Sequence, residues 1–227
     1  DNDSDVDGQL VPGTVAVTTP PAHGTATVNP ATGAVTYTPN LNWHGVDQFA
    51  YSVSDDGAPL PSETSTGAVT VTVNAVNDPP ATAADSANTN EDTPVVIDVL
   101  ANDTDVDGAL TPESVVVTQA PQHGSVTVNP ATGAITYTPA ADYNGTDAFV
   151  YQVTDDGSPL PVQNALGNVT VTINAVNDPP VARTDTANTE EDTSVTINVL
   201  GNDEDVDGNL LPGSVRVSHA PAHGAAT

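Results

Sequence analysis

A repeat of 100 residues dominates this sequence and limits the folds that the chain can adopt. Residues 1–78 match residues 101–178 without a gap at about 60% identity, and residues 179–227 resume the same pattern. The segment "NDSDVDG" returns as "NDTDVDG" and "NDEDVDG", while "VNPATGAVTYTP" returns as "VNPATGAITYTP". Because 100 residues can enclose a hydrophobic core, each repeat is expected to fold as a separate domain and not as one turn of a solenoid.

Two proline pairs, Pro79–Pro80 and Pro179–Pro180, mark the expected domain boundaries. Proline fixes φ and lacks an N–H donor, so paired prolines stiffen a connection between domains. The predicted domains are the C-terminal part of a first repeat at 1–78, a complete repeat at 79–178 and the N-terminal part of a third repeat at 179–227.

Short runs of β-branched and alternating residues predict strands in the complete repeat, separated by Gly, Pro, Asn and Asp. The predicted strands cover 82–88, 94–100, 114–119, 124–128, 133–138, 147–154 and 167–176. The segment "NPATG" at 129–133 predicts a hairpin loop with Gly133 at its exit. Phe149 and Tyr151 are expected in the core, with the tyrosine hydroxyl bonded to a backbone group. The expected fold is all-β: tandem seven-stranded antiparallel β-sandwiches of immunoglobulin-like, Greek key type.

The charge balance excludes several classes of partner. Asp and Glu number 30, but Arg183 and Arg216 are the only Lys or Arg residues, so the formal net charge is −28. Nucleic acids and anionic membranes are bound through Lys and Arg, and neither is an expected partner. The sequence has no cysteine, which excludes disulfides and thiolate metal sites. No run of 18 apolar residues occurs, so no direct membrane insertion is expected in this segment.

The loop "NDTDVDG" at 102–108 places Asp103, Asp105 and Asp107 on alternate residues before a glycine. Calcium takes six to eight oxygen ligands in flexible geometry, and such a loop can direct several carboxylates at one ion. Magnesium suits this pattern less well, because it takes fewer protein ligands and more water. The loop is not an EF-hand, because the twelfth position is Ser114 and no helix is expected beside it. The alternative is that Asp, Asn and Gly simply form Asx-turns.

In a seven-stranded sandwich, the loops 101–113 and 155–161 lie at the same end as the incoming linker. The loop with Glu91 and Asp92, the loop 139–147 and the outgoing linker lie at the other end, so unlike ends of successive repeats meet. Calcium shared between them would stiffen the junction, whereas uncompensated carboxylates would repel. The predicted metal ligands are Asp3, Asp5, Asp7, Asn77, Asp78, Glu91, Asp92, Asp103, Asp105, Asp107, Asp155, Asp156, Asn177, Asp178, Glu191, Asp192, Asp203, Asp205 and Asp207.

The motifs "EDTPVVIDVLANDTDVDG", "HGSVTVNPATGAITYTP", "NGTDAFVYQVTDDG" and "NAVNDPP" together resemble the cadherin-like and immunoglobulin-like tandem repeats of large bacterial and archaeal surface adhesins. The resemblance covers the whole chain. It implies a secreted, calcium-stiffened series of sandwiches that projects a binding domain from a cell or builds a surface fibre. Asn74 departs from the family pattern, because cadherin linkers usually carry Asp at this position.

Other chemistry is less well supported by the sequence. His23, His123 and His223 each precede a glycine between strand signals, which is typical of a turn. No G-x-S-x-G motif occurs, and the paired carboxylates recur in every repeat without an aromatic sugar platform, so no enzyme is expected. Trp43 aligns with Tyr143, which indicates a packing role; a sugar-binding aromatic is the alternative.

The predicted function is therefore that of a structural extender at the cell surface, with neighbouring repeats of the same chain as partners and Ca²⁺ as the bound ion. The alternative is a subunit of an extracellular filament or matrix, in which like chains assemble by β-strand edge addition or strand exchange.

Overall fold

The computed structural model describes residues 2–57, 60–158 and 161–227. The predicted all-β class is confirmed: apart from strands, the named elements of the described residues are two 3-10 turns, η1 (Pro12–Thr14) and η2 (Pro212–Ser214). The chain divides into two compact units. One consists of Asp1–Ala83, Leu100–Val115 and Gln152–Leu166, and the other of Ala84–Val99, Val116–Tyr151 and Gly167–Thr227.

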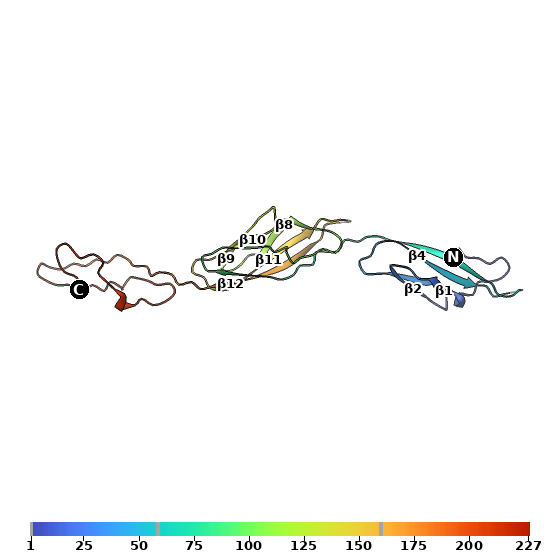
Figure 1. Cartoon of the computed structure of the whole chain (residues 1–227), viewed down its shortest axis with the longest axis horizontal. Coiled ribbons are helices and arrows are strands. Elements are labelled where there is room, and N and C mark those ends of the chain that lie inside the picture. Colours follow the sequence, from blue (N-terminus) through green and yellow to red (C-terminus); the bar gives the residue numbers. More distant parts are fainter. Residues whose placement is uncertain (1, 58–59, 159–160) are drawn as a thin grey trace. The chain divides into compact units, whose positions relative to one another are not determined.

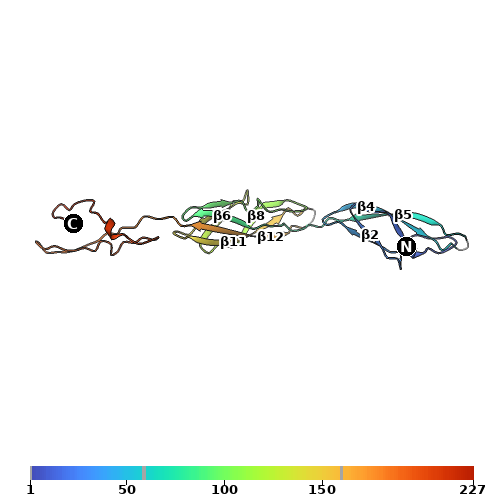
Figure 2. The ribbon, with the colours of Figure 1, turned by 60° about the horizontal axis from the view of Figure 1, so that its bottom comes forward.

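The strands between Asp85 and Asn174 form a β-sandwich, which is seen from two directions in Figures 1 and 2. One sheet has the strand order β7-β10-β9, and the other has the order β6-β12-β11-β8. The strands are β6 (Asp85–Asn90), β7 (Val95–Ile97), β8 (Leu110–Gln119), β9 (Gly124–Val128), β10 (Ile135–Pro139), β11 (Gly145–Asp155) and β12 (Asn164–Asn174). Part of the predicted loop 155–161 lies outside the described residues.

The pairing of β9 with β10 agrees with the predicted hairpin. Gly133 lies at the exit of the loop with a positive φ of +74°, and its N–H donates to the carbonyl of Asn129 at 2.8 Å. One pair differs from the antiparallel pattern, because β6 runs parallel to β12 from Asp85↔Val169 to Asn90↔Asn174. These two strands are joined by the whole intervening chain and not by a tight hairpin, so the connection permits a parallel pair.

The core of the complete repeat lies between the inner faces of its strands. Alternate residues of β11 and β12 are buried, which is the period expected when one face of a strand meets the core. Tyr137 on β10 and Phe149 on β11 lie with ring centroids 6.4 Å apart. As predicted, Phe149 and Tyr151 are buried, and the Tyr151 hydroxyl donates to the carbonyl of Val99 at 2.9 Å.

A buried carboxylate fixes the turn that precedes β9. Asp147 accepts the N–H groups of Gln122 and His123 at 3.0 and 2.8 Å, and the hydroxyl of Tyr137 at 2.9 Å. The His123 ring stacks on Tyr143 with centroids 4.1 Å apart. The "HG" motif therefore belongs to a turn, as the sequence indicated, and its imidazole packs against an aromatic ring.

Residues 1–78 repeat this arrangement with a sheet in the order β1-β4-β5 and a hairpin of β2 and β3. The bounds are β1 (Ala16–Thr19), β2 (Gly24–Val28), β3 (Val35–Pro39), β4 (Gly45–Ser54) and β5 (Thr64–Val73). Asp47 and Tyr37 reproduce the turn contacts of Asp147 and Tyr137. Tyr51 differs from Tyr151, because its hydroxyl donates to the carboxylate of Asp3 at 2.6 Å.

Residues 179–227, all of them described, contain η2 and an isolated bridge between Val181 and Glu204. The Arg183 guanidinium pairs with the Glu204 carboxylate at 2.6 Å. Within the part of the chain that the structure describes, no helix is long and apolar enough to cross a membrane.

Candidate metal centres

Each acidic loop is built around its middle aspartate. Asp105 Oδ1 accepts the N–H groups of Asp107 and Gly108 at 3.1 and 2.8 Å, and Asp5 and Asp205 make the same bonds in their own loops. This is the Asx-turn that the sequence offered as an alternative to a metal site. The turn uses one oxygen of Asp105, so the other, Oδ2, remains available to a ligand.

The loop 102–108 meets the linker that enters the complete repeat. The N–H of Asp78 donates to Asp107 Oδ2 at 3.1 Å, and the Asn77 side chain donates to Asp155 Oδ2 at 2.7 Å. The carboxylate of Asp156 lies beside Gly108, where a Cβ atom would come within 2.7 Å of it. We call this group the Asp78 cluster; its members are Asn77, Asp78, Asp103, Asp105, Asp107, Asp155 and Asp156.

Two aspartates of the Asp78 cluster also hold the backbone in place. Asp103 accepts the N–H of Ala83 at 2.9 Å. Asp155 is only 1% exposed and accepts the N–H groups of Gly157 and Gln163 in addition to the Asn77 amide. Burial acts to raise the pKa of Asp155, but these donors outweigh it and hold the pKa below its ordinary value.

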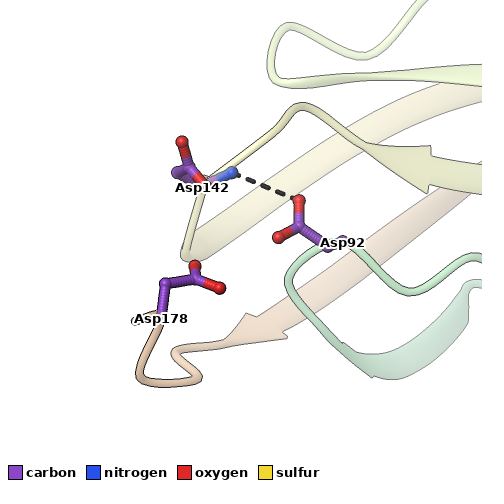
Figure 3. A group of neighbouring side chains, drawn as sticks. All are labelled: Asp92, Asp142 and Asp178. Atoms are coloured by element: carbon purple, nitrogen blue, oxygen red, sulfur yellow. Dashed lines mark hydrogen bonds between the residues drawn. The ribbon is translucent and has the colours of Figure 1, made fainter. Parts of the chain in front are cut away.

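A second group of acidic residues surrounds Asp178, where the chain leaves the complete repeat. Oxygen atoms of Asp92, Asp142 and Asp178 lie within 4.8 Å of one another, and Figure 3 shows the three carboxylates on separate loops. The N–H of Asp178 donates to Asp207 of the following acidic loop. We call this group the Asp178 cluster; its members are Glu91, Asp92, Asp142, Asp178 and Asp207.

Glu91 connects the Asp178 cluster to the backbone of the outgoing linker. Its N–H donates to the carbonyl of Asn174 at 2.9 Å, and its carboxylate accepts the N–H of Val176. Glu91 is only 3% exposed. A buried carboxylate with one polar partner is costly unless a further positive group compensates it.

The carboxylates of the Asp178 cluster repel one another. Burial raises the pKa of Asp178 above its ordinary value, and the nearby charges of Asp207, Asp142, Asp92 and Glu91 raise it further. A cation at this position would reverse the effect, because it favours the ionised form of every carboxylate around it.

Both clusters contain buried oxygen atoms that lack a hydrogen-bond partner among the described residues. In the Asp78 cluster they are Asn77 Oδ1, Asp105 Oδ2 and Asp107 Oδ1, and in the Asp178 cluster they are Glu91 Oε2 and Asp178 Oδ2. Buried polar atoms in folded proteins normally have a partner, so such atoms require an explanation. All of them are carboxylate or amide oxygens, which are the ligands that Ca²⁺ prefers, and the residues present therefore fit this ion.

Several predicted ligands are not gathered into these clusters. Glu191 and Asp192 are exposed, and the side chain of Asn177 bonds to the carbonyl of Asp178. Asp203 accepts the N–H of Arg183, as Asp103 accepts that of Ala83. Asp7 lines a cavity of about 120 Å³ together with Asp5, Asp55 and Glu63.

Asp142 is a cluster member that the predicted ligand set omits. It lies in the loop 139–147, which the sequence places at the correct end of the sandwich, but it aligns with Asn42 in the preceding repeat. The other aspartate of that loop, Asp147, is instead occupied by the turn before β9. The signal that could have separated the two is the alternation of β11, which directs Asp147 inward with Phe149 and Tyr151.

Comparison with known families matches the chain to bacterial Ig and bacterial cadherin-like domains. The bacterial Ig domain model matches residues 77–174 and 177–227, and the bacterial cadherin-like domain model matches residues 1–75. The predicted resemblance to bacterial cadherin-like and immunoglobulin-like repeats is therefore confirmed. A search of curated proteins finds no match to this chain.

Solved structures of extracellular cadherin domains match parts of the chain. Mouse Cadherin-23 EC22-24 is 19% identical, with a TM-score of 0.46; the match covers 81% of this chain and 60% of that structure. Human CDH23 EC21-23 is 22% identical, with a TM-score of 0.45 and coverage of 82% and 66%. The chain spans 30% of the Protocadherin GammaB4 extracellular domain, which is 17% identical over 77% of this chain with a TM-score of 0.42.

The repeat, the β-sandwich and the family match over residues 77–174 and 177–227 agree with one another. The chain belongs to the bacterial Ig domain family.

Proposed function

We propose that this chain is a structural extender region of an extracellular adhesin or surface fibre, in which Ca²⁺ bound at the junctions between repeats stiffens the chain. The proposed domains are 1–78, 79–178 and 179–227, so the junctions lie at Asp78 and Asp178. Cadherin-like and immunoglobulin-like families are adhesion-type domains and not enzymes, and this supports a structural role.

The observation that carries the proposal is the set of buried oxygen atoms at both junctions that have no hydrogen-bond partner within the described part of the chain. Asp107 Oδ1 belongs to a loop of one repeat, and Asn77 Oδ1 belongs to the linker before it. At the other junction, Glu91 Oε2 and Asp178 Oδ2 come from a loop and from the linker that follows the repeat. An ion that binds such a set must hold the linker against the loop.

The proposed mechanism is mechanical and electrostatic. Without a cation, like charges such as those of Asp178 and Asp207 repel one another and favour separation of the linker from the loop. Bound Ca²⁺ supplies the missing positive charge. Because the complete ligand set exists only when the junction is ordered, binding stabilises the ordered junction by mass action.

Isothermal titration of the 227-residue chain with Ca²⁺ tests this proposal, with Asp105→Asn as the informative variant. Asparagine keeps the side-chain oxygen that accepts the N–H groups of Asp107 and Gly108, but it removes the charge from the partnerless oxygen. We expect saturable binding by the native chain and a loss of affinity of at least about tenfold at one site in the variant, since ligand charge sets calcium affinity.

Asp98→Asn is the matched control, because Asp98 is an exposed aspartate of the same repeat outside both clusters. It removes the same charge and should leave the affinity within about twofold of the native value. If the native chain shows no saturable binding, the calcium proposal is wrong and the acidic loops are only solvated turns. Assembly of like chains through strand edges would then be the function to examine.

A further inference from the structure

We propose that residues 185–199 of one copy of this chain dock on residues 1–78 of a second copy, where they add one strand beside β5 and another beside β3. We call residues 185–199 the docking segment, and we call the outer edges of β3 and β5 the open edges. The proposal concerns contacts between chains, so it goes beyond the proposed function and does not depend on calcium.

The complete repeat shows how such a segment is seated. There, β6 runs parallel to β12 with Asp85 opposite Val169, and β7 runs antiparallel to β10 with Ile97 opposite Ile135. Ile97 is only 6% exposed, and Val99, which follows β7, is 0% exposed. One continuous stretch of chain therefore adds a strand to each sheet of the sandwich and covers the core between them.

The equivalent edges have no such cover in residues 1–78. β5 ends the sheet β1-β4-β5, and β3 pairs only with β2, so no strand among the described residues lies on either open edge. Val69, Val71 and Val73 of β5 are only half-buried, whereas their counterparts on β12 are between 0% and 3% exposed. An edge with unpaired N–H and C=O groups is a template for another strand.

One hydrogen bond of the complete repeat is replaced by another beside the open edges. The Tyr151 hydroxyl donates to the carbonyl of Val99, which belongs to the stretch that covers the core. The aligned Tyr51 hydroxyl donates instead to the carboxylate of Asp3 at 2.6 Å. The docking segment would supply Tyr51 with the carbonyl of Val199, the counterpart of Val99.

The docking segment has apolar side chains that are not covered. Val195, Ile197 and Val199 are 45%, 46% and 38% exposed, and no residue from 185 to 199 belongs to a strand (Figure 1). Apolar residues on alternate positions are the pattern of a strand that buries one face. The segment therefore has the pattern of a strand but has no sheet to pair with in its own repeat.

The docking segment matches residues 85–99 at every position that faces the core. The more buried residues of β6 and β7 are the odd-numbered ones, and at all odd positions from 85 to 99 the residue 100 positions later is identical. The two segments differ only at positions 86, 90, 94, 96 and 98 and at their counterparts. On the open edges, Val69 and Val71 likewise match their counterparts on β12.

The register of the contact follows from the complete repeat. Displacing its pairs by 100 residues places Asp185 opposite Val69 and Ile197 opposite Val35. Because the docking segment and the open edges are different parts of each copy, the contact is heterologous, and successive copies join head to tail. Both surfaces are acidic, so screening by salt should strengthen the contact.

Sedimentation equilibrium of the 227-residue chain, in chelator and at raised salt, tests the proposal. Ile197→Asp alters the docking segment, and Thr196→Asp is its matched control, because both residues are exposed but only position 197 would face the core. Val71→Asp alters an open edge, and Thr72→Asp, on the outer face of the same strand, is its control. Circular dichroism verifies that each variant is folded.

We expect the average mass of the native chain to rise between about 1 µM and about 1 mM. Ile197→Asp and Val71→Asp should each weaken association at least about tenfold, since docking would bury an unpaired charge. The two controls should stay within about twofold of the native chain. A mixture of Ile197→Asp and Val71→Asp retains one intact docking segment and one pair of intact edges, so it should form a dimer and nothing larger.

A disulfide between copies tests the register, because the chain has no cysteine of its own. Ser86 and Thr170 are Cα partners in the complete repeat, so mixed Thr186→Cys and Thr70→Cys chains should cross-link. Asn188→Cys is the matched control, because it lies two residues out of register with Thr70→Cys. Its mixed disulfide should form at least about tenfold more slowly, since the two Cα atoms would be too far apart.

Three results would overturn the proposal. A native chain that stays monomeric over this range does not dock on a second copy, even if its shape shows that the segment folds back within one chain. Association that Ile197→Asp and Thr196→Asp leave equally strong belongs to another surface. Equal cross-linking by Thr186→Cys and Asn188→Cys would contradict the register. None of these results depends on calcium, so each leaves the proposed function to its own test.

Discussion

At the scale of single residues, the fold depends on positions where the backbone must approach a side chain closely. Gly167 on β12 faces Tyr151, and a Cβ atom at this position would lie 2.2 Å from Cζ of the ring. Gly67 and Tyr51 repeat the arrangement, with a distance of 2.5 Å. The Tyr151 ring is fixed by its hydroxyl bond to Val99, so it cannot move away without loss of that bond.

Gly167→Ala is therefore expected to destabilise the complete repeat by about 1–3 kcal/mol, the usual range for an overfilled core. Urea unfolding of the 227-residue chain measures this change. Ala165→Gly, two residues earlier on the same strand, is a useful contrast, because it removes a methyl group instead of adding one. A Gly167→Ala chain as stable as the native one would show that the Tyr151 ring has room to shift.

The buried carboxyl of Asp147 has a pKa below its ordinary value. Burial acts to raise its pKa, but the N–H groups of Gln122, His123 and Ala148 and the Tyr137 hydroxyl outweigh burial and lower it. The pKa of Asp47 is lowered by the same kinds of bond. A carboxyl with a lowered pKa in the folded state contributes stability that is present above its unfolded pKa of 3.8 and is lost as pH falls through the folded pKa.

Asp147→Asn should cost about 2–4 kcal/mol at pH 7, because an amide cannot accept all of these bonds and places a donor against N–H groups. The variant should also lose less stability than the native chain when the pH falls below 3.8. Chemical unfolding at pH 7 and at pH 3 measures both effects. Equal acid sensitivity in the two chains would contradict the role given to Asp147.

At the scale of elements, the linkers and loops respond to pH in the opposite direction. The raised pKa of Asp178 means that its contribution to stability is fully present below 3.8 and is lost as pH rises through the folded pKa. In chelator, the Asp178 junction should therefore be less ordered at pH 7 than at a pH below 3.8.

Carbon NMR of the Asp178 carboxyl tests this directly. The expected pKa lies above 3.8 in chelator and falls in Asp142→Asn, because that variant removes one of the charges that raise it. An unshifted pKa in the native chain would mean that the carboxylates of the Asp178 cluster are too far apart in solution to repel.

Most strands were predictable from the local sequence, but the pairing of strands that lie far apart in the sequence was not. Strand β9 coincides with the predicted range 124–128, and Gly133 ends the hairpin as expected, because alternation and turn residues act over a few positions. The parallel pairing of β6 with β12 could not be predicted in this way, since the two strands are about 80 residues apart. The approach of Asp142 to Asp178 depends on this long-range assembly as well.

Residues that look equivalent in the sequence have different hydrogen-bond partners in the structure. Asp103, Asp105 and Asp107 share one motif, yet Asp103 bonds to Ala83, Asp105 forms the turn and Asp107 bonds to the linker. Similarly, Tyr51 and Tyr151 align, but their hydroxyls bond to a carboxylate and to a carbonyl respectively. The motif indicates the kind of ligand, whereas the fold decides which oxygen remains available.

At the scale of the whole molecule, the sequence concentrates negative charge where repeats join. The 30 Asp and Glu residues are opposed by only two arginines, which leaves a formal net charge of −28, and one of these arginines is paired with Glu204. A chain of this composition has little means of balancing its junctions except by cations from solution. Calcium should therefore stabilise the connection between repeats more than it stabilises the cores, which are already stabilised by apolar packing.

Small-angle X-ray scattering of the 227-residue chain, in excess Ca²⁺ and in chelator, tests this central claim most directly. The account predicts a larger and more sharply defined maximum dimension in calcium, and the loss of this difference in a chain that carries both Asp105→Asn and Asp178→Asn. Identical scattering in calcium and in chelator would contradict the account, because the junctions would then be equally stiff or equally flexible without the ion.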